Sequence, residues 1–205
     1  MKKRPGKGTV GDALTTVDKR RKKAVKKVLV ILAEGFEEIE AVGPADVLRR
    51  AGVRVVLAGL ETLRVRGAHG MELTAEALLS DAADEKFDGV FLPGGLPGAT
   101  NLLASEAVGR ILKSTAARGG VVSAICAAPI VLAKHGLLAG KTFTMYPGFD
   151  KYLGGLVPTG RLAERCGNVV TGKGPGAVFA FARELAAALG VETEEVFRGM
   201  FVALP

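Results

Sequence analysis

The chain of 205 residues is 48% hydrophobic, a composition typical of a packed globular protein with one sizeable core. Its formal net charge of +7 is concentrated near the start. Residues 1–27 carry eleven Lys or Arg against two Asp, which leaves 17 basic and 19 acidic residues in the rest of the chain. That nearly neutral remainder gives no electrostatic case for a nucleic-acid-binding domain. No apolar run approaches the roughly 18 residues of a membrane span.

The basic segment, residues 1–26, is interpreted as a disordered, solubilising extension. Its run KRRKK (19–23) leaves three alternatives open: nuclear import, organelle targeting, or contact with a polyanion such as nucleic acid. The segment lacks the apolar region of a secretory signal. The chain has two cysteines, forty residues apart, and no such signal, which favours a reducing, cytoplasmic compartment over a disulfide framework.

From residue 27 onward, short apolar runs alternate with helical patterns. In chain order the sequence predicts a strand at 27–33, a helix at 37–52, strands at 53–59 and 87–95, a helix at 104–120, a strand at 121–125, a helix at 127–136, strands at 141–146 and 168–172, and a helix at 177–190. Continuous Val, Ile and Leu in the strands are typical of a parallel sheet covered on both faces. Helices between the strands supply the crossovers. We therefore expect a single α/β sandwich over residues 27–205, with a mainly parallel central sheet.

Cys126 is the first candidate for chemistry, because it directly follows the strand predicted at 121–125. Active sites of open parallel sheets lie beyond the carboxyl ends of the strands. The segment AICAA (124–128) has the small-x-nucleophile-x-small spacing of a sharp strand-to-helix turn. A helix N-terminus at this point would lower the pKa of the thiol. The N–H of Ala127, with that of Gly95 or Gly94, would face a developing oxyanion. The alternative is that Cys126 is a small buried hydrophobe.

Glu40 is the second candidate. On a helical wheel of residues 37–52 it falls within the apolar arc, whereas Glu38 lies opposite and, with Glu34 and Glu37, is read as an ordinary acid at a helix start. A carboxyl on an apolar face should keep its proton at neutral pH and serve as a general acid or base. The wheel leaves a second interpretation equally open, in which Glu40 reaches solvent from the first turn.

Other chemistries have weaker support. His135 lies at the far end of the helix predicted at 127–136, and His69 lies in a turn-rich segment, so a Cys-His pair has no support. Two scattered histidines offer no metal-ligand spacing, and we predict no metal site. The loop GKGPG (172–176) lacks the Lys-Ser/Thr ending of a phosphate-binding loop. Cys166, in ERCGNVV, is interpreted as structural.

Four motifs together resemble a known family. They are VLVILAEGFEEIEAVGPADVLRRAG (28–52), FLPGG (91–95), AICAAP (124–129) and TGKGPG (171–176). In this order and spacing they resemble the ThiJ/PfpI superfamily, most closely its DJ-one subfamily, over residues 27–205. The resemblance implies a flavodoxin-like three-layer sandwich of the class I glutamine amidotransferase type, a homodimer, and a nucleophile at Cys126 hydrogen-bonded to an acid at Glu40.

The resemblance also implies an activity. Members of this group are described as glutathione-independent glyoxalases and deglycases that act, without a cofactor, on methylglyoxal, glyoxal or their early protein adducts, giving 2-hydroxy acids. Others are described as chaperones or sensors of oxidative stress whose cysteine oxidises, and this remains the alternative for Cys126. Three positions depart from the pattern. Tyr146 stands where many relatives carry a histidine, His69 where an arginine often flanks the site, and Ala127 where protease-like members have a histidine.

Overall fold

The computed structural model describes residues 24–203, so the extension predicted for residues 1–26 lies outside this range except for its last three residues. The central sheet has seven strands in the order β5-β2-β1-β6-β7-β9-β8. All neighbouring pairs are parallel except β8 and β9. In chain order the bounds are β1 Lys27–Leu32, β2 Arg54–Gly59, β5 Ala77–Leu78, β6 Gly89–Leu92, β7 Val121–Ile125, β8 Ala163–Cys166 and β9 Val169–Gly172. The mainly parallel sheet predicted from the apolar runs is confirmed.

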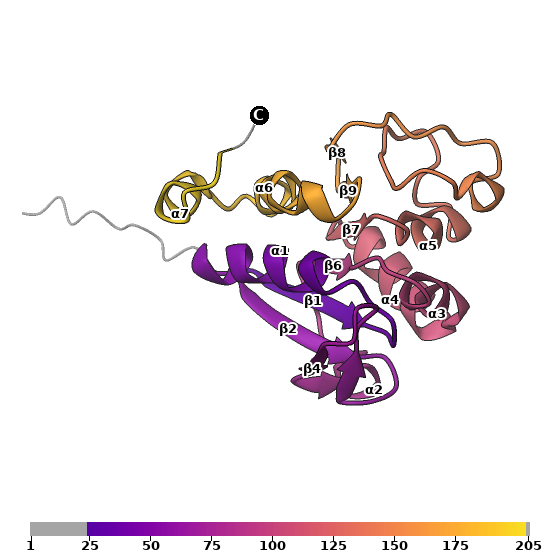
Figure 1. Cartoon of the computed structure of the whole chain (residues 1–205), viewed down its shortest axis with the longest axis horizontal. Coiled ribbons are helices and arrows are strands. Elements are labelled where there is room, and N and C mark those ends of the chain that lie inside the picture. Colours follow the sequence, from indigo (N-terminus) through magenta and orange to yellow (C-terminus); the bar gives the residue numbers. More distant parts are fainter. Residues whose placement is uncertain (1–23, 204–205) are drawn as a thin grey trace, which may run out of the picture.

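Helices cover both faces of this sheet and give three layers (Figure 1). One face carries α1 (Glu38–Arg50) and α6 (Val178–Ala188), with α7 (Glu194–Gly199) packed beside them; the other carries α2 (Leu79–Ala82), α3 (Gly98–Ala104), α4 (Glu106–Ala117) and α5 (Pro129–Lys134). Strand β1 shows why its sequence is continuously apolar. Val28 and Val30 pack in the cluster under α1 and α6, whereas Leu29 and Ile31 pack in the cluster under α3, α4 and α5. The predicted flavodoxin-like sandwich is confirmed.

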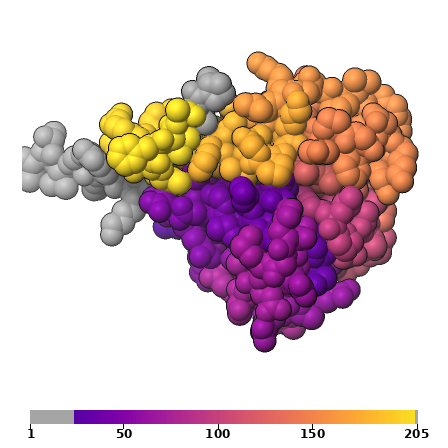
Figure 2. Space-filling view, viewed as in Figure 1, coloured from indigo at the N-terminus to yellow at the C-terminus, as the bar shows by residue number. Residues whose placement is uncertain are grey.

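A separate two-stranded hairpin, β3 (Arg64–Arg66) and β4 (Glu72–Thr74), stands beside the start of α1. Backbone hydrogen bonds attach it there: Gly35 N donates to Arg66 O at 2.8 Å, and Ala68 N donates to Phe36 O at 2.7 Å. The hairpin therefore lies against the residues that lead into α1. The C-terminal helices also pack on the N-terminal part of the described chain, and Figure 2 shows the yellow segment directly against the indigo one.

Several boundaries differ from those predicted. The strand predicted at 141–146 is wrong: the segment belongs to no strand, and Thr144 N donates to the side chain of Thr171 at 2.9 Å. The helix predicted at 104–120 is observed as α4, which begins at Glu106 after Ser105 caps it by accepting a hydrogen bond from Val108 N. The sequence did not predict the hairpin β3–β4, the strands β5 and β8, or the helices α2, α3 and α7. Two 3₁₀ turns, Asp150–Tyr152 and Pro175–Ala177, complete the described elements. Within residues 24–203, no helix is long and apolar enough to cross a membrane.

Candidate active site

Cys126 stands immediately after β7 in the left-handed backbone region, with φ of 63°. This region is costly for a residue with a Cβ and is found mostly where surrounding contacts enforce it. Two backbone hydrogen bonds hold it here: Cys126 N donates to Gly172 O at 2.9 Å, and Tyr146 N donates to Cys126 O at 2.9 Å. The helix α5 then begins at Pro129. The sharp turn predicted from the small residues around Cys126 is confirmed, and the side chain remains partly exposed.

Backbone N–H groups from two separate turns reach the thiol. Those of Gly95 and Ala127 are near enough to the sulfur to act to lower the pKa of Cys126. Gly95 has φ of 86°, and a Cβ added there would lie 2.6 Å from Gly35 O, so both its conformation and its packing require glycine. Gly94, the other donor considered, instead donates its N–H to Glu40 Oε2 at 2.9 Å. The structure thus brings Gly95 and Ala127 to the sulfur and Gly94 to the acid.

Glu40 is fully buried, so it does not reach solvent from the first turn as the second interpretation expected. Burial raises the pKa of Glu40 to about 7, and the charge of Glu37 adds to the rise; the nearby Cys126 thiol and the hydrogen bond from Gly94 N–H act in the opposite direction. Its second oxygen, Oε1, is buried and has no well-formed hydrogen bond to any described residue, although the Cys126 thiol is near enough to shift its pKa. The carboxyl therefore has one oxygen fixed and one free to exchange a proton with the thiol or a ligand.

The thiol and the acid titrate as one unit. Burial raises the pKa of Cys126 to about 12, and the charge of ionised Glu40 and a hydrogen bond with it add to the rise. This corrects the sequence-based expectation of a lowered thiol pKa, because these effects outweigh the N–H donors of Gly95 and Ala127. The two groups cannot both ionise at neutral pH, and between the two steps the pair holds one proton. Because the thiol has the higher pKa, the proton resides mainly on Cys126, and its transfer to Glu40 gives a thiolate beside the N–H groups of Gly95 and Ala127.

Tyr146 and His69 lie in different surroundings. The backbone of Tyr146 contacts Cys126, and its ring is half exposed beside the turn at Gly174. His69 lies instead in the turn of the β3–β4 hairpin, where its Nδ1 is 2.9 Å from Glu38 Oε2. Cys166 lies on β8. Of these residues, only Tyr146 is brought to Cys126 by a hydrogen bond.

Sequence reasoning missed the surroundings of Glu38. The wheel places Glu38 opposite the apolar arc, yet its residue is 4% exposed, because the hairpin covers it. Glu38 Oε1 accepts hydrogen bonds from His69 N at 2.8 Å and Met71 N at 3.3 Å. The close approach depends on Gly67, where any Cβ would collide with the Glu38 carboxyl. Glu38 thus attaches the hairpin to α1, and the glycines of RGAHG (66–70) were the signal of a tight approach.

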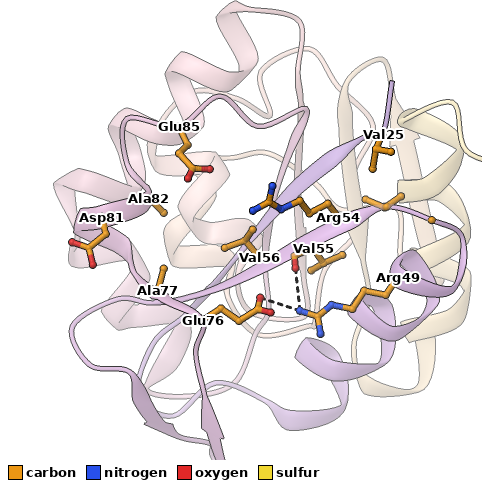
Figure 3. Close-up of a pocket in the computed structure, with 12 residues that line it drawn as sticks. Val25, Arg49, Arg54, Val55, Val56, Glu76, Ala77, Asp81, Ala82 and Glu85 are labelled. Atoms are coloured by element: carbon orange, nitrogen blue, oxygen red, sulfur yellow. Dashed lines mark hydrogen bonds and ion pairs between the residues drawn. The ribbon is translucent and has the colours of Figure 1, made fainter. Parts of the chain in front are cut away.

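A hollow of about 760 Å³ lies at the opposite edge of the sheet and shares no residue with the Cys126 site (Figure 3). Strand β5 pairs only with the last two residues of β2, so the rest of this edge is open. Arg49 donates to Val55 O and to Glu76 Oε2, each at 3.0 Å, and Glu76 Oε2 also accepts from Leu57 N. These side chains occupy the free backbone positions of an edge strand, which is a structural role.

The arrangement of a strained cysteine, a buried glutamate and a glycine turn can be compared with known proteins. The sequence profile of the DJ-1/PfpI family matches residues 26–188. The chain belongs to the DJ-1/PfpI family. The crystal structure of DJ-1beta from Drosophila melanogaster superposes with a TM-score of 0.82 at 41% identity, covering 88% of this chain and 100% of that one. The resemblance inferred from the four motifs is therefore confirmed.

Curated relatives in the DJ-1/PfpI family agree with this assignment. Protein dj-1beta of D. melanogaster is 41% identical over 183 residues, which cover 87% of this chain and 98% of that protein. A glutathione-independent glyoxalase of Caenorhabditis elegans is 36% identical, covering 79% and 88% of the two chains. A deglycase of Pyrococcus abyssi is 30% identical, covering 77% and 96%. Glyoxalase and deglycase activities are thus named among close members of the family.

Proposed function

We propose that this protein is a cysteine-dependent, cofactor-independent glyoxalase or deglycase, acting on methylglyoxal, glyoxal or their early protein adducts. The observation that carries the proposal is the pairing of Cys126 with a buried Glu40 whose pKa is raised to about 7, beside two N–H donors at the same sulfur. The names of the relatives from C. elegans and P. abyssi support the reaction class.

The reaction begins from the form of the pair in which Glu40 holds the proton. The Cys126 thiolate attacks the aldehyde carbon of the 2-oxoaldehyde, and a carbon–sulfur bond forms as the carbonyl π bond opens. The developing oxyanion lies by the N–H groups of Gly95 and Ala127, which now stabilise oxygen in place of sulfur. Glu40 gives this oxygen its proton, and a hemithioacetal results.

Glu40, now a carboxylate, removes the hydrogen on the former aldehyde carbon as a proton to give an enediolate, and returns it to the neighbouring carbon while the hydroxyl proton of the first carbon passes to the oxygen of the second. The first carbon is oxidised to a thioester while its neighbour is reduced to an alcohol. Water then cleaves the thioester and releases a 2-hydroxy acid and the free thiol. No external electron acceptor is needed, because the oxidation and the reduction balance within the substrate. Tyr146, half exposed beside the cysteine, would contact the substrate on its solvent side.

The test measures lactate formed from methylglyoxal without glutathione. We expect activity in the wild type and in Cys166→Ser, the matched control at the other cysteine, and none in Cys126→Ser or Glu40→Gln. Circular dichroism of each variant shows whether it is folded. A wild type no faster than Cys126→Ser would reject the enzymatic proposal. Oxidation of Cys126 by peroxide, followed by intact mass, would then test the redox-sensing alternative.

We also propose that the protein is a homodimer. Ile39 and Val42 on α1 are exposed apolar residues, as is Met71 in the hairpin, whose backbone N–H contacts Glu38 of the same helix; exposed apolar residues on adjoining elements favour contact with a second copy. Light scattering after gel filtration should give twice the mass of the chain, and Ile39→Glu should shift it toward the monomer. A monomeric wild type at micromolar concentration would reject this proposal.

A further inference from the structure

Glu37, Glu38 and His69 form a compact group of possible metal ligands, separate from Cys126 and Glu40. One atom of each, two carboxylate oxygens and a ring nitrogen, lie within 4.8 Å of one another. His69 Nδ1 is 2.9 Å from Glu38 Oε2 and 3.7 Å from Glu37 Oε1. Two bonds of about 2.1 Å at a tetrahedral metal place their ligand atoms about 3.4 Å apart. The two measured separations lie on either side of that value, so small side-chain rotations would complete the geometry.

The two carboxylates are deeply buried, unlike ordinary surface acids. Glu37 is 7% and Glu38 is 4% exposed. Burying two like charges side by side is costly unless a cation compensates them. The cation that the described residues offer to both is His69, which supplies at most one positive charge. A divalent cation bound by both carboxylates and a neutral imidazole would balance the charge completely.

The two carboxylate oxygens of Glu37 have different contacts. Glu37 Oε2 accepts a hydrogen bond from Glu40 N at 2.7 Å and so caps α1. Glu37 Oε1 is directed at His69, but its separation of 3.7 Å from Nδ1 exceeds a hydrogen bond. Glu37 Oε1 is therefore paired with the imidazole by charge alone, at a distance that leaves room for an ion between the two atoms. Glu38 is held in place by the hairpin N–H groups, so two ligands are fixed before a metal arrives.

The third ligand, His69, makes the site reachable for an ion and determines which metals fit it. The His69 side chain is 66% exposed, so an ion can enter from solvent, and a water molecule can take the fourth position. Mixed imidazole and carboxylate ligands favour Zn²⁺ and similar transition metals over Mg²⁺ and Ca²⁺, which prefer all-oxygen sites. Binding replaces the hydrogen bond between Nδ1 and Glu38 with metal bonds to both groups and releases any proton on Nδ1 to water.

We propose that Glu37, Glu38 and His69 form a binding site for one divalent transition-metal ion per chain, with Zn²⁺ as the best fit. The sequence spacing predicted no metal site. The proposal departs from that prediction because the hairpin brings His69 beside Glu38, which lies 31 positions earlier in the chain.

The test is calorimetric titration of the full chain with ZnCl₂ in a Cys126→Ser/Cys166→Ser background, which removes the two thiols as competing zinc ligands. We expect saturable binding of one ion per chain. His69→Gln can keep a hydrogen bond to Glu38 but removes the imidazole, and it should weaken binding by more than about tenfold. His135→Gln is the matched control, because His135 follows α5, away from this group, and it should leave binding unchanged.

A second measurement locates the ion. Crystals grown with ZnCl₂ should show an anomalous peak about 2.0–2.2 Å from His69 Nδ1 and from a carboxylate oxygen of Glu37 and of Glu38. Melting temperatures recorded without metal verify that the His69→Gln protein is folded. No saturable binding in the background protein, equal binding after His69→Gln, or a peak at other residues would each overturn the proposal.

Discussion

Replacing Glu40 by glutamine should remove activity and, at neutral and alkaline pH, make the folded protein more stable. Glutamine has nearly the same shape as glutamate, and its carbonyl oxygen can accept the hydrogen bond that Glu40 receives from Gly94 N–H. Its amide would occupy the position of the unpaired buried oxygen. The substitution thus keeps the packing and removes an ionisable group that folding holds in an unfavourable environment.

The size of the effect follows from the pKa. Folding raises the pKa of Glu40 from 4.5 to about 7, which corresponds to about 3 kcal/mol at 25 °C. A carboxyl with a raised folded-state pKa binds its proton more tightly in the native state. Stability is therefore lost as the pH rises from the unfolded value toward the folded one, and the loss is complete above about 7. The variant has no such loss, so its advantage should be near zero below pH 4.5 and about 3 kcal/mol at pH 8.5.

Urea denaturation of both proteins from pH 4.5 to pH 8.5 measures this difference. Glu61→Gln, at an exposed position, is the control and should track the wild type at every pH. An advantage of Glu40→Gln that does not change with pH would refute the assignment of the raised pKa to Glu40. A variant less stable than the wild type at pH 8.5 would refute it more directly, since the amide would then fit worse than the carboxylate.

Three further predictions follow from contacts in the structure. In Gly94→Ala the added Cβ would lie 2.6 Å from Glu40 Oε2, so lactate formation should be lost and urea stability should fall by about 1–3 kcal/mol. Gly109→Ala would collide with the His135 ring and lose a similar amount of urea stability, whereas Gly176→Ala, which meets open space, should stay within about 0.5 kcal/mol of the wild type. For methylglyoxal, kcat/KM should rise as the pH increases through about 7, where the catalytic pair loses its first proton; a profile that is flat from pH 5 to 9 would contradict this.

The fold and the sharp turn that holds Cys126 could be predicted because both depend on local sequence. Strand β1 is apolar at every position since both of its faces are covered, and the pattern is visible in six residues. The turn at Cys126 was recognisable from the small residues on either side. Burial of Glu40 needed the resemblance as well, because the wheel alone left two interpretations open. In each of these cases the decisive contacts involve neighbouring elements of a regular sheet.

The surroundings of Glu38 and His69 could not be predicted in the same way. They depend on a hairpin whose strands have three residues each, too short for an alternating pattern to stand out. The segment 141–146 misled for the opposite reason. It has strand-like residues, but Tyr146 N donates to Cys126 O rather than to a strand. Strand propensity records which residues tolerate an extended backbone, whereas sheet membership depends on a free partner edge.

The site combines two features that each lower the stability of the fold. A non-glycine residue with φ of 63° costs about 1–3 kcal/mol, and the buried Glu40 costs about as much at neutral pH. A glycine at position 126 and an apolar residue at position 40 would avoid both costs and leave the strands and helices unchanged. The two costs fall on residues that affect each other's pKa, beside the N–H groups of Gly95 and Ala127. Their coincidence is what a catalytic pair requires, and packing alone provides no reason for it.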